Sequence, residues 1–301
     1  MGKSPFALAL AALLAITLPA TACINEVGTN HHGELIRPMN YVGQRLATYL
    51  GPRNEKKLLA DLTRLRVAEV RKSPSFPNLI DLSSSLIYLD RLSDAAKLLE
   101  FLEQKYPGHF ETAANLGTTY ELMGRNEEAL KWILEGIKRN PEDHAGTEWL
   151  HVLILKAKLG RIAKPARGQS ILGLDFGTEA MPIRPSSLPA GNYAKPLPLY
   201  SVALAIRYQL LERLEFVAPP DPMLAALLLD WANLELLAGT MESADVLYDA
   251  ALRYGSREKR IIDLRKAQVA KILEQAKKNP TLKEGTCELC EPPRLEDIKG
   301  A

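Results

Sequence analysis

Residues 112–141 read TAANLGTTYELMGRNEEALKWILEGIKRNP, and this stretch decides the fold. Leu116, Tyr120 and Met123 follow one another at i, i+4 and i+7, which is the spacing of one face of a helix. Gly124 is placed where that helix must end and turn, and Pro141 cannot continue the helix that follows. The stretch therefore predicts two helices joined by a short turn.

The same unit occurs once before, 34 residues earlier in the chain. A fixed period of this length is typical of arrays of stacked helical hairpins, whereas an ordinary hairpin requires no second copy. The recurring pairs at this period are Leu82 and Leu116, Ala95 and Ala129, and Pro107 and Pro141.

The second copy resembles a tetratricopeptide repeat. The positions that carry the resemblance are Leu116, Gly117, Tyr120, Gly124, Ala129, Ile133, Gly136 and Pro141. In such a repeat two antiparallel helices cross closely, so one helix needs a small residue where the other presents a bulky one. The resemblance implies an all-α fold in which helical hairpins form a right-handed solenoid. It implies an N-terminal repeat region over residues 41–160, with units at about 76–109 and 110–143 and a partial unit at 144–160.

Two further helical stretches flank these units. Residues 41–50 and 54–72 are predicted to form a pair of helices that caps the first unit, because the first unit of a stack must be shielded. The second of these helices carries Leu58, Leu59, Leu62, Leu65 and Val67 along one side. Residues 199–278 are predicted as a C-terminal helical repeat region, with helices at 200–216, 222–238 and 241–254 and a charged capping helix at 256–277.

Residues 161–198 interrupt the array with a long loop rich in proline and glycine. Within it, residues 171–178 read ILGLDFGT and resemble the first phosphate-binding turn of actin-like and sugar-kinase-like ATPases. Those enzymes also need a second phosphate-binding segment and a metal-binding acid in a large α/β domain, and nothing around the loop supplies them. We therefore predict a buried apolar plug made by Ile171, Leu172, Leu174 and Phe176; an enzyme site on the loop is a rival hypothesis.

The N-terminus has the pattern of an export signal. Residues 1–22 combine Lys3, a short apolar run and the small residues Ala20-Thr21-Ala22, which is typical of a cleaved signal peptide. The following Cys23 resembles the lipidated cysteine of a bacterial lipobox, although Ala20 stands where a branched residue is usual. Lipidation would also account for one cysteine of an odd count of three. We expect lipidation at Cys23, a polar tether over 23–40 and a cell-envelope protein anchored facing the periplasm; the alternative is a soluble periplasmic chain.

The tail, residues 279–301, is expected to be flexible and contains Cys287 and Cys290. A CxxC pair in an exported protein favours a disulfide. A thiol-redox or metal-binding protein is the main alternative. Against it, no βαβ pattern accompanies the pair, Glu288 and Glu291 disfavour the thiolate, and zinc would need two more ligands.

The charge, the aromatic content and the histidines argue against nucleic-acid binding and against a catalytic site. A net charge of +2 and 6% aromatic residues give no basic field or stacking platform for nucleic acid. No nucleophile neighbourhood accompanies His109, His144 or His151, so we predict no catalytic residue, metal or cofactor.

The tetratricopeptide resemblance implies a peptide-binding groove lined by the first helix of each unit. We expect a non-catalytic scaffold or adaptor that binds an apolar or basic segment of a protein partner. The implied groove residues are Tyr88, Ala114, Thr118, Glu121, Leu122, Glu148, Val152, Lys156 and Asn233, with Ile80, Ser84 and Ile87 beside Tyr88 in the first unit.

Overall fold

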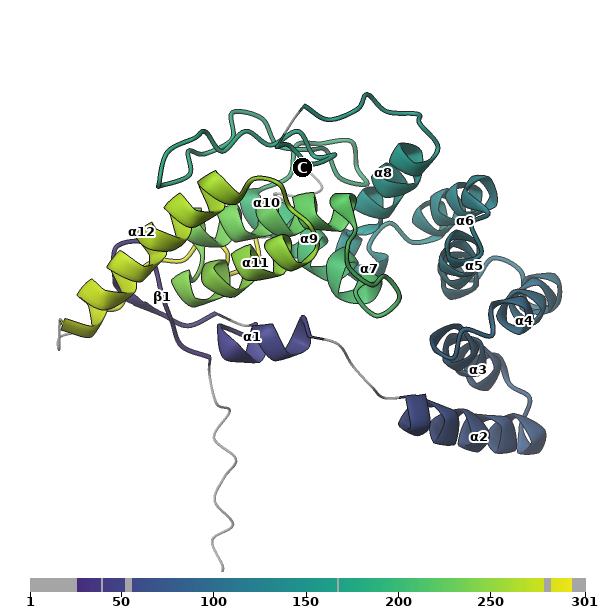
Figure 1. Ribbon diagram of the computed structural model, residues 1–301. Coiled ribbons are helices and arrows are strands. Elements are labelled where there is room, and N and C mark those ends of the chain that lie inside the picture. The colour runs from purple at the N-terminus through teal and green to yellow at the C-terminus, as the bar shows by residue number, and fades with distance from the viewer. Residues whose placement is uncertain (1–25, 39, 52–55, 167, 279–282, 294–301) are drawn as a thin grey trace, which may run out of the picture.

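Helices form most of the computed structural model (Figure 1). It describes residues 26–38, 40–51, 56–166, 168–278 and 283–293, and the prediction of a helical fold is confirmed for them. The helices within these ranges are α1 (Gln44–Tyr49), α2 (Lys56–Lys72), α3 (Phe76–Tyr88), α4 (Leu92–Lys105), α5 (Phe110–Leu122), α6 (Asn126–Arg139), α7 (Asp143–Gly146), α8 (Glu148–Lys158), α9 (Leu199–Arg213), α10 (Pro222–Ala238), α11 (Met241–Arg253) and α12 (Lys259–Lys278). None of these helices combines the length and the apolar character needed to cross a membrane.

The helices α2 to α8 lie side by side in an arc (Figure 1). The pair α5–α6 is held close by Gly117. A Cβ atom at that position would lie 2.3 Å from Ile133 Cδ1, which explains why a residue without a side chain is needed there. Gly124 ends α5 in the left-handed region at φ 76°, and its N–H donates to the carbonyl of Glu121. Apolar residues of α3 to α6 and of α8 form one continuous core, in which Leu99, Leu116 and Ile133 are buried.

Between α6 and α8 the chain makes a left-handed turn, labelled α7. His144, Ala145 and Gly146 have φ angles of 50°, 56° and 71°. L-residues other than glycine adopt this conformation at a cost of roughly 1–2 kcal/mol each. The surrounding contacts therefore have to stabilise the turn at His144 and Ala145.

A second core lies in the C-terminal half, around α10. Its largest fully buried side chain is Trp231, at 2% exposure. Helices α9, α11 and α12 contribute Ile206, Leu247 and Ile262 to this core. Helix α8 belongs to both cores, since Val152 and Leu155 face the first core while Leu150 and Ile154 face the second. Helix α8 is thus the shared wall of the two halves.

The two helices expected to cap the array are in separate places. Leu46 and Leu50 lie in the C-terminal core, where α1 packs against α11. Helix α2 packs against α3, with Thr63 buried. On its predicted apolar side, Leu58, Leu62 and Leu65 are exposed, whereas Leu59 and Val67 are partly buried.

The expected tether and tail lie against the C-terminal half in their described parts. Strand β1 (Gly28–Thr29) pairs antiparallel with β2 (Leu35–Ile36). Thr29 donates its N–H and Oγ–H to the carboxylate of Glu242 in α11, at 2.9 and 2.8 Å. Leu35 bonds through its backbone to Lys283 and Gly285 of the tail, so the two ends of the chain are joined here.

The segment between α8 and α9 runs over the C-terminal helices (Figure 1) and contains no helix in its described residues. Leu174 and Phe176 are 3% and 5% exposed and belong to the C-terminal core, while Ile171 and Leu172 pack partly buried against it. The predicted plug is confirmed for these side chains. Arg265 of α12, which is buried, donates to the carbonyls of Phe176, Gly177 and Glu179 and thereby fixes the segment.

Candidate functional site

A pocket opens where α5, α8 and the end of α9 meet. Thr118, Glu121 and Leu122, three of the residues predicted to face a groove, line one wall of it. The other walls come from α8, the end of α9 and the start of α10. We call it the groove pocket; its lining is Thr118, Glu121, Leu122, His151, Ile154, Lys158, Glu212, Arg213, Phe216, Val217, Asp221, Met223 and Leu224.

An aromatic pair extends this wall toward α3. Tyr88, the last residue of α3, stacks on Phe216 with 5.6 Å between the ring centroids and 25° between the ring planes. Tyr88 remains 47% exposed, and Phe216 is half-buried. Phe216 lines the pocket together with Leu122 and Val217, and its stacking partner Tyr88 adds an exposed aromatic ring next to it. An apolar ligand there gains from both burial and ring contact.

Next to this surface lies a cluster of charged side chains that are buried except for the partly buried His144 and the exposed Lys158. We call it the charged seam: Glu121, His144, Glu148, His151, Lys158 and Arg213. Its centre is the carboxylate of Glu121. That carboxylate accepts hydrogen bonds from His151 Nε2 at 2.6 Å, Lys158 Nζ at 2.8 Å and Arg213 Nη2 at 3.1 Å. Burial alone would raise the pKa of Glu121, but Arg213, His151 and Lys158 hold it well below its usual value. Glu121 is therefore ionised and already paired within the protein.

The second carboxylate of the seam joins two histidines. The carboxylate of Glu148 accepts hydrogen bonds from His144 Nδ1 at 2.5 Å and from His151 Nδ1 at 3.2 Å. His151 thus has a carboxylate at each ring nitrogen, an arrangement that requires the doubly protonated ring. Burial opposes the charge on His144, but the hydrogen bond to Glu148 raises its pKa to about 9, and contact with Glu121 and Glu148 likewise raises the pKa of His151. At neutral pH the seam holds two carboxylates and four cationic groups, and their ion pairs join α5, α7, α8 and α9.

The other predicted groove residues do not line this pocket. Ala114 and Val152 are buried among helices, and Glu148 lies inside the seam. Lys156 and Val152 line a separate hollow between α6, α8 and residues 189–192. Asn233 is 3% exposed, and its Oδ1 accepts from Tyr248 Oη at 2.8 Å and from Arg265 Nη1 at 2.7 Å. Thr118, Glu121 and Leu122 of the second unit thus share a pocket with Phe216, on which Tyr88 stacks, whereas Ala114, Asn233 and the predicted residues of the third unit do not line it.

Cys287 and Cys290 form a disulfide in the described part of the tail. Leu289 is buried against the end of α10, and its N–H donates to the carbonyl of Ala238. Glu288 forms an ion pair with Arg184 of the segment between α8 and α9. Across the described ranges no three His, Cys, Asp or Glu side chains are grouped so as to hold a metal ion. Cys23 lies outside the described residues, so its lipidation stays a prediction.

Part of the charged seam can be recognised in the sequence. His144, Glu148 and His151 are spaced i, i+4 and i+7, so they share one side of the chain around α8. Arg213 and Phe216 follow more than 40 residues after α8 in the sequence, and no local pattern connects them with α5 or α3. Only the packing of α9 against α8 brings them to the groove.

A scan against protein-family models found no family that matches this chain, and a search of curated proteins found no match either. The functional argument therefore rests on the site itself.

Proposed function

We propose that this chain is a non-catalytic interaction scaffold that binds an apolar peptide segment in the groove pocket. The observation that carries the proposal is the aromatic pair of the exposed Tyr88 and the half-buried Phe216, beside a pocket in which Glu121 is already paired with Arg213, His151 and Lys158. An apolar ligand that covers this surface leaves Glu121 with its partners.

The finer fold in this proposal is a right-handed solenoid of tetratricopeptide-like hairpins with a long proline- and glycine-rich loop after the third unit. Its support is the 34-residue period together with the packing of consecutive helices. Gly117 against Ile133 is the small-to-large contact that such a hairpin requires. The groove pocket then lies along the first helices of the units, where these repeats bind peptides.

The ligand in the proposal is apolar rather than basic. Three carboxylates line the pocket. Glu121 is occupied by Arg213, His151 and Lys158, so a ligand lysine would have to displace one of these cations there. Asp221 caps α10 by accepting from the N–H of Leu224, and burial raises the pKa of Glu212, which disfavours its charged form. Apolar side chains of a ligand can pack on Leu122 and Met223, two of the apolar residues lining the pocket, without displacing an ion.

We also propose that the protein is exported and anchored by a lipid at Cys23. The support is the signal pattern and the disulfide between Cys287 and Cys290, which leaves Cys23 as the odd cysteine of three. Intact mass of protein from a membrane fraction tests this. The expected mass is that of residues 23–301 plus acyl groups, lost in Cys23→Ala; an unmodified mass in both proteins contradicts it.

The thiol-redox alternative is less well supported. Cys290 is 6% exposed, and the backbone around it is bonded to the end of α10. These contacts favour a disulfide that fixes the tail. A free-thiol assay on protein purified without reductant distinguishes the two, since the proposal expects no free thiol at Cys287 and Cys290.

Site-specific photo-crosslinking tests the groove assignment. The photoreactive residue p-benzoylphenylalanine replaces Tyr88 or, as a matched control, Phe101 of α4, whose exposure of 46% is nearly that of Tyr88. Irradiation in cells is expected to join a polypeptide to position 88 and not to position 101. The same adducts at both positions, or none at position 88, would contradict the proposal.

A further inference from the structure

The outer side of α2 carries apolar side chains at the free end of the array (Figure 1). Leu58, Leu62 and Leu65 follow one another at i, i+4 and i+7, so they share one face of the helix. All three are exposed, whereas Thr63 is buried on the side where α2 packs against α3. We call these leucines the α2 stripe. Because the end of a helical array normally has a polar outer face, an apolar stripe there indicates an interaction surface.

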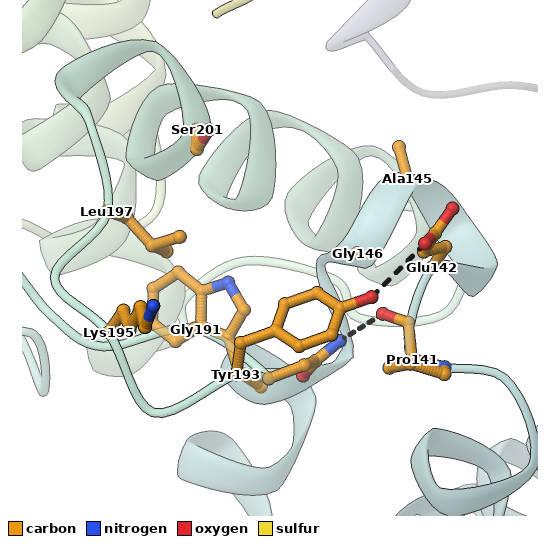
Figure 2. Close-up of a pocket in the computed structure, with 11 residues that line it drawn as sticks. Pro141, Glu142, Ala145, Gly146, Gly191, Tyr193, Lys195, Leu197 and Ser201 are labelled. Carbon is orange, nitrogen blue, oxygen red and sulfur yellow. Dashed lines mark hydrogen bonds between the residues drawn. The ribbon is translucent and has the colours of Figure 1, made fainter. Parts of the chain in front are cut away.

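In the other half of the molecule the chain covers apolar side chains itself. Asn192 Nδ2 donates to the carbonyl of Pro141 at 2.7 Å, and Tyr193 Oη donates to the carboxylate of Glu142 at 3.2 Å (Figure 2). These bonds fix the segment between α8 and α9 against the α7 turn, and Leu197 of this segment is buried. No described residue covers the α2 stripe in this way.

Cations lie at both ends of the α2 stripe. Residues 56–72 contain six Lys and Arg and two Asp and Glu, a net charge of +4, whereas the whole chain has a net charge of +2. Lys57 precedes the stripe, and Arg71 and Lys72 follow it; all three are exposed. Among the described residues none of these three forms an ion pair, whereas Arg64 pairs with Asp61 at 2.6 Å. The stripe is therefore flanked by positive charge that no carboxylate of the described chain neutralises.

Helix α12, at the opposite end of the chain, shows that positive charge alone does not make such a surface. It contains seven Lys and Arg and two Asp and Glu. Its apolar side chains Ile262, Val269 and Ile272 are buried, while Leu264 is exposed. Lys266 is paired with two carboxylates of α11. Helix α2 thus differs from α12 in presenting several leucines and several unpaired cations on one exposed surface.

We infer that the α2 stripe docks on an anionic lipid bilayer. A helix with leucines on one face and Lys and Arg beside them lies in the plane of the membrane interface, with the leucines among the acyl chains and the cations at the phosphate headgroups. Three leucines on one helix are a small patch beside the roughly 1,200–2,000 Å² that a stable protein interface buries, whereas a bilayer requires no complementary shape. A second copy of this chain is disfavoured as the cover, because it would bring two net charges of +4 together.

Flotation with lipid vesicles tests the inference on residues 24–301. This protein lacks the apolar N-terminal run and Cys23 but keeps every residue that the structure describes, so the result does not depend on the proposed export or lipid anchor. The vesicles consist of phosphatidylcholine alone or of an equimolar mixture with phosphatidylglycerol. Binding to the mixed vesicles is expected to be at least about tenfold stronger and to weaken as salt is raised. Equal binding to both, or no binding to the mixed vesicles, would overturn the inference.

A pair of matched variants locates the contact. Leu58→Gln/Leu65→Gln removes the two most exposed leucines of the stripe and is expected to weaken binding to the mixed vesicles at least about tenfold. Phe101→Gln/Leu134→Gln removes two exposed apolar side chains of α4 and α6 and is expected to leave binding unchanged. Circular dichroism checks that both proteins fold. Equal losses in the two proteins would contradict the assignment to α2.

The charges are tested separately, so the inference stays open to refutation if the leucine variant does not fold. Arg71→Gln/Lys72→Gln should lose most of the preference for mixed vesicles, whereas Lys271→Gln/Lys277→Gln, which changes two exposed lysines of α12, should keep it. Glu69→Gln removes an exposed acid one turn beyond the stripe and should strengthen binding. Equal effects of the two double variants, or weaker binding of Glu69→Gln, would contradict the inference.

Sedimentation velocity without vesicles distinguishes a bilayer from a second copy of the chain. A monomer is expected for residues 24–301. A dimer that dissociates in Leu58→Gln/Leu65→Gln would assign the α2 stripe to a second copy and overturn the inference.

Discussion

The two halves of the molecule bury their apolar side chains differently. In α10, twelve of seventeen residues are buried, and the helix is apolar on every side. In α2, at the other end of the array, Leu58, Leu62 and Leu65 are 56%, 41% and 62% exposed. The C-terminal half is thus closed around one helix, while the α2–α6 half keeps apolar surface in contact with solvent. Our proposal places binding in the open half, with the closed half as its support.

Removing Arg265 is expected to have the largest effect, because it anchors the closed half. Arg265→Met would remove one of two donors to Asn233 Oδ1 and to the carbonyl of Phe176, and it would remove the Arg265 bonds to the carbonyls of Gly177 and Glu179. Breaking a buried network of this kind costs about 3–5 kcal/mol in free energy of unfolding. Urea unfolding measures the loss. Arg260→Met, on the exposed side of the same helix, should change the free energy of unfolding by less than about 0.5 kcal/mol. Equal losses of stability in the two variants would show that the Arg265 network is unimportant.

Raising the pH is expected to weaken the connection between the halves. The pKa of His144 is raised from 6.5 to about 9, so its stabilising contribution is complete below pH 6.5 and lost as the pH rises through 9. For a single group, a pKa difference of this size corresponds to about 3 kcal/mol in free energy of unfolding. His151 is shifted in the same direction, and Asp143, Glu148 and Glu212 face His144 with negative charge.

Melting temperatures of the unaltered chain and of His144→Gln, measured between pH 6 and 9.5, test this expectation. The difference between the two proteins should shrink as the pH rises. A control, His109→Gln, changes an exposed histidine that stacks on Phe76 and is not part of the seam. A difference that is independent of pH would contradict the account of the seam.

A smaller effect is expected inside the open half. Gly117→Ala would place its Cβ 2.3 Å from Ile133 Cδ1 and 3.2 Å from the backbone nitrogen of Ile133. Overpacking of this kind costs about 1–3 kcal/mol. Shortening the partner in Gly117→Ala/Ile133→Val should recover part of the loss, because the two sites are in direct contact. Additive losses in a double-mutant cycle would show that α5 and α6 do not depend on this contact.

The sequence predicted those parts of the fold that depend on local patterns. Helix α10 was expected at 222–238 and is Pro222–Ala238, because Asp221, Pro222 and Gly239 mark its ends. The positions of α1 and the strands could not be predicted, since Leu46 packs against α11 at a distance of about 200 residues along the chain. The groove was predictable only on its α5 wall, because Arg213 and Phe216 reach it through the packing of α9. Export, lipidation and the binding role remain predictions.

Binding of the crosslinked polypeptide to defined variants tests the central claim most directly. The affinity of that polypeptide is measured for the unaltered chain, for Tyr88→Ala and for Phe101→Ala, two aromatic residues of nearly equal exposure on opposite helices of one hairpin. The account predicts about a tenfold or greater loss for Tyr88→Ala and no change beyond about twofold for Phe101→Ala. Equal losses for the two variants, or a loss confined to Phe101→Ala, would contradict binding in the groove pocket.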